Sequence, residues 1–251
     1  MGNFKINSGN ENQNFIPTQS YQELLRSFSK LKKERGSILH VVGAPGVGKS
    51  ANIYQASTEV GLKVYEAKLI LDNEYIRPKT VFQHTLRAMR EDLGVKNDFE
   101  LYNTLEEFDM VLIADRFHDS HLINPGTVGF SQWSASKGWG AFPYYWYCLE
   151  EYLKHKSEFK NINVVFQTSW RVELGGRKRD LFADLGVVSR ISLIILKIPF
   201  QVVEISYSTV ETINIVKSHF PYMDEGRITK GIDKYGCKPR FICQALKTGK
   251  I

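Results

Sequence analysis

The chain has 251 residues, of which 43% are apolar and 24% charged, a composition typical of a globular protein that buries a sizeable core. Its formal net charge of +6 is compatible with a polyanionic partner but too small to indicate one. Three scattered cysteines exclude a disulfide framework and indicate a reducing, cytoplasmic setting. The polar first residues exclude a signal peptide, and no apolar run is long enough to cross a bilayer, so we expect no membrane partner.

The first part of the chain predicts an arm followed by an amphipathic helix. Residues 1–18 are mostly polar and predict a loose arm or a clasp. Residues 19–35 predict a helix, because Leu24, Phe28 and Leu31 recur at helical spacing and fall on one face. The basic residues at the end of this segment suit the negative end of the helix dipole, and a glycine follows them as a stop signal.

A complete Walker A loop, with the spacing Gly-x4-Gly-Lys-Ser, follows an apolar strand at 37–42 and precedes a predicted helix at 51–60. In such a loop the glycines allow tight turns that point backbone N–H groups at a β-phosphate. Lys49 would reach the β- and γ-phosphates, and the Ser50 hydroxyl would ligate Mg²⁺. The residues that we expect to hold the phosphates of ATP are Gly43, Ala44, Pro45, Gly46, Val47, Gly48, Lys49 and Ser50.

Strands and helices alternate through the middle of the chain. The sequence predicts strands at 62–67, 110–115 and 162–169 and helices at 79–93, 101–108 and 144–156. This alternation predicts a parallel sheet, and ligands of such sheets bind at the carboxyl ends of the strands. We therefore expect the Walker A loop, Asp115 and Thr168 to converge at one edge of the sheet.

The character of the sequence changes after Arg190. Two β-rich runs, at 191–198 and 201–205, predict a last strand or a hairpin. Three short helices are predicted beyond it, near 208–219, 224–235 and 239–248. The predicted fold is therefore an α/β P-loop fold with a three-layer parallel sheet, followed by a small C-terminal helical domain.

Two strand ends carry candidate catalytic side chains. Asp115 ends a buried-type strand, and in a P-loop chain a carboxylate at this place (Walker B) holds the Mg²⁺ shell. An ordinary strand-end carboxylate is the alternative. Thr168 and Ser169 would lie beside the γ-phosphate, in the position called sensor 1, although a simple turn uses the same residue types.

The arrangement resembles the AAA+ ATPase superfamily over roughly residues 20–250. Ser189-Arg190 resembles the pair with which clamp loaders and related AAA+ proteins present an arginine finger to a neighbouring subunit. The resemblance implies a homo-oligomer or a partner protein, and a polar turn entering a strand is the alternative. The run 236–242 resembles the start of the sensor 2 helix, which implies that Arg240 reaches the γ-phosphate; a plain helix start with a solvated arginine is the alternative.

The same resemblance implies a division of the chain into an N-terminal arm at 1–18, a P-loop ATPase core at 19–206 and a helical lid at 207–251. More narrowly, the size and the run of the sequence resemble the DnaA-like AAA+ proteins encoded by spindle-shaped viruses of Sulfolobus. That closer resemblance implies a viral protein that works in the cytoplasm of an archaeal host.

The sequence departs from the AAA+ pattern where the catalytic base is expected. AAA+ enzymes usually carry Asp-Glu at Walker B, whereas Asp115 is followed by Arg116. Glu66, which ends the adjacent strand, lies where RecA-like and KaiC-like ATPases keep their base, and Asp119 is a weaker substitute. The sensor 2 segment also has one residue more than usual, so the aim of Arg240 stays open.

Three further segments allow several interpretations. Residues 118–121 offer metal ligands but too few of them, so we expect a loop near the nucleotide. The aromatic segment 126–140 predicts a plug over the sheet, a stacking surface for single-stranded bases or a subunit contact. Basic residues at Arg171 and 175–179 predict a trans-acting arginine, a phosphate contact or a solvated loop.

These features predict an ATP-binding AAA+-type ATPase that hydrolyses ATP with Mg²⁺ in DNA replication initiation or another nucleic-acid transaction, with DNA as a candidate partner. One alternative is an ATP-dependent assembly switch with slow or no hydrolysis, which Arg116 favours. Another is a RecA/KaiC-like ATPase that uses Glu66 as its base. A small-molecule phosphotransferase fits less well, because a kinase lid is normally an insertion within the sheet, whereas here helices follow it.

Overall fold

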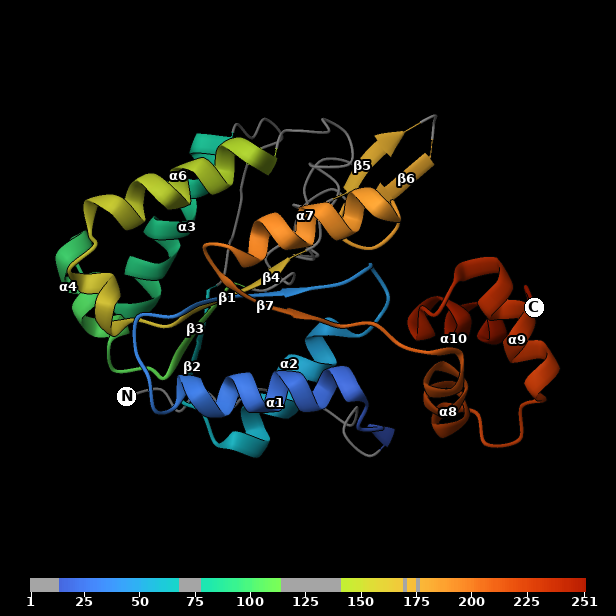
Figure 1. Cartoon of the computed structure of the whole chain (residues 1–251). Helices are drawn as coiled ribbons and strands as arrows, with labels where there is room; N and C mark the ends of the chain where they lie inside the picture. Colours follow the sequence, from blue (N-terminus) through green and yellow to red (C-terminus); the bar gives the residue numbers. More distant parts are fainter. Residues whose placement is uncertain (1–13, 68–77, 114–140, 169–170, 175–176) are drawn as a thin grey trace.

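The computed structural model describes residues 14–67, 78–113, 141–168, 171–174 and 177–251 (Figure 1). The elements of the first half are α1 (Gln19–Leu31), β1 (Ile38–Val42), α2 (Lys49–Val60), β2 (Val64–Glu66), α3 (Pro78–Leu93), α4 (Asp98–Leu105) and β3 (Met110–Ile113). The elements of the second half are α6 (Ala141–Lys154), the 3₁₀ helix η4 (Glu158–Asn161), β4 (Val164–Thr168), β5 (Arg171–Leu174), β6 (Arg177–Asp180), α7 (Val187–Lys197), β7 (Gln201–Glu204), α8 (Thr209–His219), α9 (Glu225–Tyr235) and α10 (Pro239–Lys247).

Five of the described strands form one parallel sheet in the order β2-β3-β4-β1-β7. Strand β4 therefore lies between β1, which leads into the Walker A loop, and β3, which leads toward Asp115. In the register of β1 and β4, Val42 is level with Thr168, so both strands end at the same edge of the sheet. This topology confirms the predicted α/β fold with a Walker A loop between its first strand and the following helix.

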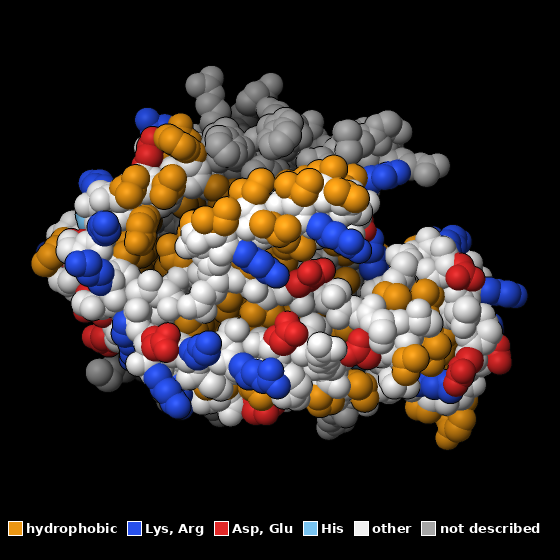
Figure 2. Space-filling view, viewed as in Figure 1, with side chains coloured by type: hydrophobic (Ala, Val, Ile, Leu, Met, Phe, Trp, Pro, Cys, Tyr) orange, Lys and Arg blue, Asp and Glu red, His pale blue; other side chains and the backbone are white. Residues whose placement is uncertain are grey.

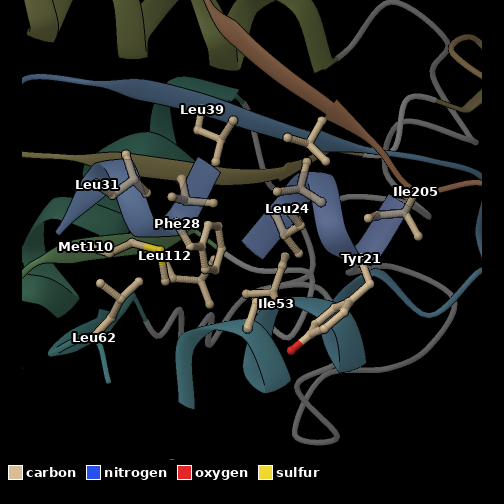
Figure 3. Close-up of a cluster of buried hydrophobic side chains, with 14 of the residues drawn as sticks. Tyr21, Leu24, Phe28, Leu31, Leu39, Ile53, Leu62, Met110, Leu112 and Ile205 are labelled. Atoms are coloured by element: carbon tan, nitrogen blue, oxygen red, sulfur yellow. The ribbon is translucent and has the colours of Figure 1, made fainter. Parts of the chain in front are cut away.

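One face of the sheet is covered by α1 and α2 (Figure 1). Alternate residues of β3, Met110 and Leu112, join a buried cluster with Leu24 and Phe28 of α1 and Ile53 of α2 (Figure 3). Side chains along a strand point alternately to the two faces of the sheet, so every second residue of β3 faces this cluster. The helix predicted at 19–35 is confirmed, with its apolar face turned to the sheet.

The opposite face of the sheet packs on helices from the middle of the chain. Val111 of β3 and Val164 of β4 belong to a second buried cluster with Met89 of α3 and with Leu101 and Tyr102 of α4. Helices α6 and α7 lie on this same side of the sheet (Figure 1). The protein therefore has three layers, with helices on both faces of a sheet whose central strands are apolar on both sides.

The three C-terminal helices have a small core of their own, and Figure 1 shows them grouped at one end of the sheet. Val216 of α8, Ile228 of α9 and Ile242 of α10 are each 0% exposed. Helix α8 begins with a capping box, in which Ser208 and Glu211 bond each other's backbone N–H groups. All three predicted helices are present.

One local prediction was wrong. Residues 191–198, predicted as a strand, belong to helix α7 and its C-terminal cap. Their four isoleucines favour a strand. However, Ser189 and Leu193, four residues apart, are both buried, so packing against the sheet selects helical spacing. Strands β5 and β6, which lie in the basic segment for which a solvated loop was one of three interpretations, pair antiparallel.

No helix among the described residues is long and apolar enough to cross a membrane.

A single buried amide joins the C-terminal end of α1 to the segments that lead into three strands. Asn163 precedes β4 and is 0% exposed, and its Oδ1 accepts a hydrogen bond from the Ser37 N–H at 3.0 Å. Its Nδ2 donates to three backbone carbonyls, those of Leu31 (2.8 Å), Glu34 (2.9 Å) and Asp109 (3.0 Å). The side chain therefore joins the end of α1 to the starts of β1, β3 and β4.

We predict that Asn163→Leu lowers the free energy of unfolding by about 3 kcal/mol, because an apolar side chain of similar size leaves these buried backbone groups without partners. Urea unfolding of the full chain measures the change. Asn103→Ala is the matched control, since Asn103 is exposed on α4 and its loss is expected to cost less than about 0.5 kcal/mol. Equal costs for the two variants would contradict the role given to Asn163.

Candidate functional site

The Walker A loop leaves β1 and enters α2 through glycines whose positions do not accept a side chain. A Cβ at Gly43 would lie 2.5 Å from the carbonyl oxygen of Ile205, which follows β7. Gly46 has φ +87°, and a Cβ there would lie 3.0 Å from the ring of Phe241 on α10. The loop is thus fitted between the end of β7 and the C-terminal helices, and it closes through strained turns that favour glycine.

The N-terminus of α2 has donors without intrahelical partners. The first four N–H groups of a helix have no intrahelical acceptor, and Gly48, the N-cap of α2, has no side chain to bond them. The helix dipole adds partial positive charge at the same place. An anion is the natural partner of such a helix start.

Lys49 and Ser50 open α2 with their side chains held close to the loop. Lys49 is 4% exposed, and its ammonium group donates to the Gly43 carbonyl at 2.8 Å and, more weakly, to the Ala44 carbonyl at 3.4 Å. The Ser50 hydroxyl lies 3.2 Å from Nε2 of Gln167. The Lys49 ammonium could exchange these carbonyls for a phosphate bound in the same loop, because the two kinds of acceptor would lie at a similar distance from its Cα atom.

Gln167 is a site residue that the sequence analysis missed. It is 6% exposed and lies one residue before the end of β4, on the strand face turned to α2. Thr168, which was predicted to lie beside the γ-phosphate, has its hydroxyl on the other face, 2.9 Å from Nδ1 of His40. The alternation of side chains along β4 separates these two neighbours, so of these two described residues it is Gln167 that contacts the Walker A segment at Ser50.

His40 is a buried, neutral residue of β1. It is 4% exposed, and its ring stacks on Phe166 with centroids 5.0 Å apart. Burial lowers the pKa of His40 from 6.5 to about 4, because the charged form is poorly solvated there. His40 therefore holds the Thr168 hydroxyl as a neutral imidazole at physiological pH.

Glu66 ends β2 and is tied to the helix that follows the Walker A loop. The Tyr54 hydroxyl of α2 donates a hydrogen bond to Oε1 of Glu66 at 2.7 Å. In the sheet, Glu66 is level with Leu112, one strand away from β4. The hydrogen bond with Tyr54 therefore fixes the Glu66 carboxylate relative to α2, although β2 is not adjacent to β1 in the sheet.

Arg190 lies in the first turn of α7, exposed, and none of the described residues forms an ion pair with it. The helix that carries it has an apolar outer face. Figure 2 shows this row of apolar side chains, and Ile191, Ile194 and Ile195 are between 52% and 63% exposed. A guanidinium beside an uncovered apolar helix face is suited to contact a second protein surface.

The start of α10 contacts the Walker A loop directly. The backbone N–H of Arg240 donates to the Gly46 carbonyl at 3.1 Å, while the Arg240 side chain is exposed. Lys238, the N-cap of α10, forms an ion pair with Asp184 at 3.0 Å between the segment before α7 and the C-terminal helices. The Walker A loop therefore touches α10 through a backbone hydrogen bond and the Phe241 ring, and the ion pair ties α10 to the segment before α7.

Some predicted residues lie outside the part of the chain that the structure describes. They are Asp115, Arg116, Asp119, Ser169, the segment 118–121 and the aromatic segment 126–140. For Arg171 and most of the β5–β6 hairpin only the backbone is described.

A separate group of potential metal ligands lies between α4 and α6. Ligand atoms of Asp98, Glu151 and His155 lie within 4.8 Å of one another. Asp98 already pairs with Arg90 and lies 3.9 Å from Lys154, and Glu151 accepts the Tyr102 hydroxyl at 2.7 Å. Asp98 is balanced by cations of the protein and Glu151 is held by a hydroxyl, so we interpret the group as a tie between two helices rather than as a metal centre.

The Walker A residues fit a nucleotide with Mg²⁺. Gly48 leaves the start of α2 without a side-chain cap, so the backbone there is suited to an anion, and Lys49 and Ser50 supply the cation and the hydroxyl. The buried Oδ1 of Asn52, one turn into α2, has no hydrogen-bond partner, so this end of the helix also has an unused acceptor. Ser50 is the described residue able to ligate the metal.

Comparisons with known proteins give only distant likeness. No protein-family model and no curated protein matches the chain. Similar solved structures are a DNA replication initiation factor (14% identity, TM-score 0.45), replication initiator DnaA bound to AMPPCP and single-stranded DNA (15%, 0.43) and AMPPCP-bound DnaA from Aquifex aeolicus (15%, 0.42). Each alignment covers 95% of this chain but only 63% or 64% of the other, so this chain spans less than two thirds of their length. Likeness at this level does not identify a function.

We predict that His40 makes the protein less stable in mild acid. Its pKa is about 4 in the folded protein and near 6.5 in the unfolded chain, so as pH falls below 6.5 the unfolded chain takes up the proton first. The resulting loss is about 3 kcal/mol between pH 7 and pH 4. Urea unfolding across this range measures it for wild type and for His40→Phe, which cannot titrate. Parallel pH profiles for the two proteins would contradict the prediction.

Proposed function

We propose that the chain is an ATP-binding P-loop ATPase of the AAA+ type. The observation that carries the proposal is the start of α2, where an uncapped helix N-terminus, the buried Lys49 ammonium and the Ser50 hydroxyl meet at one loop. These groups supply the donors and the positive charge that a triphosphate needs. The Walker A spacing alone predicts them, and their burial and orientation in the fold support the assignment.

In this proposal each described side chain has a chemical role. Lys49 leaves its loop carbonyls for the β- and γ-phosphates, and Ser50 ligates Mg²⁺ together with Asp115. When bound, the metal neutralises charge on the phosphates. Gln167 positions the Ser50 hydroxyl through its amide.

The sequence lacks the usual catalytic base after Asp115, and we assign this role to Glu66. Its carboxylate is held by Tyr54, and a carboxylate on this strand would orient the attacking water from the side of β2. Glu66 lies two strands from β1, with β3 and β4 between them, and Arg116 replaces the usual base. This arrangement favours slow turnover.

We further propose that residues 19–206 are the ATPase core, 207–251 the lid and 1–18 the arm. The contacts of Arg240 and Phe241 with Gly46 support a lid that responds to the Walker A loop. The exposed Arg240 side chain is the part of this helix free to reach a γ-phosphate.

A homo-oligomer and a role on DNA complete the proposal. The apolar outer face of α7 and the exposed Arg190 beside it support contact with a second copy, to which Arg190 would present an arginine finger. Action in replication initiation in the cytoplasm, and the link to spindle-shaped archaeal viruses, rest on the sequence resemblance alone. An assembly switch with little hydrolysis is the second candidate, favoured by Arg116 after Asp115.

We predict that Lys49→Ala weakens ATP binding about 10- to 100-fold, because it removes a charge-assisted hydrogen bond to phosphate. Calorimetric titration with MgATP measures the affinity. Lys63→Ala is the control, because Lys63 is an exposed partner of Glu107 and its removal is expected to change the affinity less than about two-fold. Unchanged affinity in Lys49→Ala would overturn the nucleotide site.

We predict that Asp115→Asn and Glu66→Gln each lower ATP turnover at least 100-fold by removing a metal ligand and the base. Glu107→Gln, an exposed carboxylate, is the control. Phosphate release is measured with no DNA, with single-stranded DNA and with double-stranded DNA, and the oligomeric state is recorded in parallel. Turnover stimulated by DNA in an oligomer supports the ATPase. Tight binding without turnover supports the switch, and unchanged turnover in Glu66→Gln excludes Glu66 as the base.

A further inference from the structure

An apolar cavity of about 540 Å³ lies on the far side of β1 and β4 from the Walker A helix, between the sheet, α3, α6 and the end of α7. Phe166 of the sheet, Leu86 of α3, Leu149 of α6 and Phe200 after α7 are among its walls. Protein interiors are normally packed without voids of this size, whereas small-ligand pockets occupy about 300–1,000 Å³. The cavity therefore has the volume and lining of a binding site.

The cavity reaches the surface between two helices. Trp146 and Leu149 of α6 line it and are 51% and 40% exposed. Figure 2 shows apolar side chains on both α6 and α7 on this side of the molecule. An apolar molecule would therefore find an apolar entrance as well as an apolar interior.

One buried polar atom in the wall has an unused hydrogen-bonding position. His40 is 4% exposed, its Nδ1 is engaged by Thr168, and none of the described residues bonds its Nε2. The rings of Phe166 and Phe200 fix the imidazole, with centroids 5.0 Å and 4.8 Å away. Two other polar groups of the wall already donate hydrogen bonds: the Thr85 hydroxyl to the Val81 carbonyl and the Tyr102 hydroxyl to Glu151.

From this arrangement we propose that the cavity binds a neutral aromatic or polycyclic molecule with one hydrogen-bonding group, which pairs with Nε2 of His40. A neutral ligand fits this wall better than a charged one, because its described lining is mostly apolar and its carboxylate, Glu151, already accepts the Tyr102 hydroxyl. One polar group on the ligand would pair with Nε2 of His40, and the remaining ligand surface would meet a wall that is mostly apolar.

The site is placed to influence the Walker A loop. His40 lies three residues before Gly43 on β1 and bonds Thr168, the neighbour of Gln167. A ligand that fixes this imidazole therefore acts on both strands whose ends carry the loop and the Ser50 contact. This coupling rests on the proposed nucleotide site, whereas the cavity itself does not.

The test uses 2-naphthol and naphthalene, which differ by one hydroxyl group, in equilibrium fluorescence titrations of the full chain. Saturable binding to one site is expected, with 2-naphthol about 3- to 10-fold tighter, the gain of one hydrogen bond. In His40→Phe this preference disappears, and because it is a ratio within one variant it is insensitive to a general loss of affinity. No saturable binding in the wild type overturns the proposal, and a preference that persists in His40→Phe overturns the role of His40.

Filling the cavity gives an independent test. Leu86→Trp combined with Leu196→Trp adds bulk inside the walls, and at least 10-fold weaker binding is expected. Ile194→Trp is the matched control, because it adds the same side chain to α7 at a position that is 63% exposed and outside the cavity. Thermal unfolding verifies that each variant folds, and if the double variant does not, Leu196→Trp alone replaces it. Equal binding by the filled and control variants overturns the location.

Coupling is tested with the nucleotide. Saturating 2-naphthol is expected to change the affinity for MgATP, and MgATP to change the affinity for 2-naphthol by the same factor. Equal ATP affinity with and without the probe overturns the coupling. Lys49→Ala, in which ATP binding is expected to be weakened, should still bind 2-naphthol with the wild-type affinity. Loss of 2-naphthol binding in this variant would contradict the claim that the cavity is separate from the nucleotide site.

Discussion

The parallel pairing of β1 with β4 is the constraint on which the rest of the site depends. Because the two strands end level with each other, the turn that leaves Val42 becomes the Walker A loop beside the last residues of β4. The alternation of side chains then sends Gln167 to Ser50 on one face and Thr168 to His40 on the other. One pairing thus places the phosphate loop on one side of the sheet and the buried imidazole on the other.

The second organising contact joins the loop to the C-terminal helices. The Gly46 carbonyl accepts the Arg240 N–H, and the Phe241 ring lies where a side chain at position 46 would stand. A change in the shape of this loop would therefore move the start of α10, because closely packed groups cannot shift independently of each other. In the proposed ATPase, nucleotide bound at the Walker A loop would affect the C-terminal helices directly through this contact.

Most elements could be predicted because their signals are local. The helix at 19–35 follows from the spacing of Leu24, Phe28 and Leu31, and the Walker A loop from its glycines and its flanking elements. Helix α7 could not, because its Ile and Val content favours a strand while its burial against the sheet selects a helix. Nor could Gln167 be chosen over Thr168, because the face on which each side chain lies depends on strand register.

The sequence by itself determined the Walker A spacing, because Gly43, Lys49 and Ser50 lie close together along the chain, and this spacing predicts phosphate-binding chemistry. It also determined the alternation of strands and helices, and so the fold class. Only the tertiary structure decided which side chains meet. The Tyr54–Glu66 pair and the cavity beside His40 join segments that the sequence leaves far apart. Local chemistry is written in neighbouring residues, whereas strand order, register and helix packing are set by the burial of the whole chain.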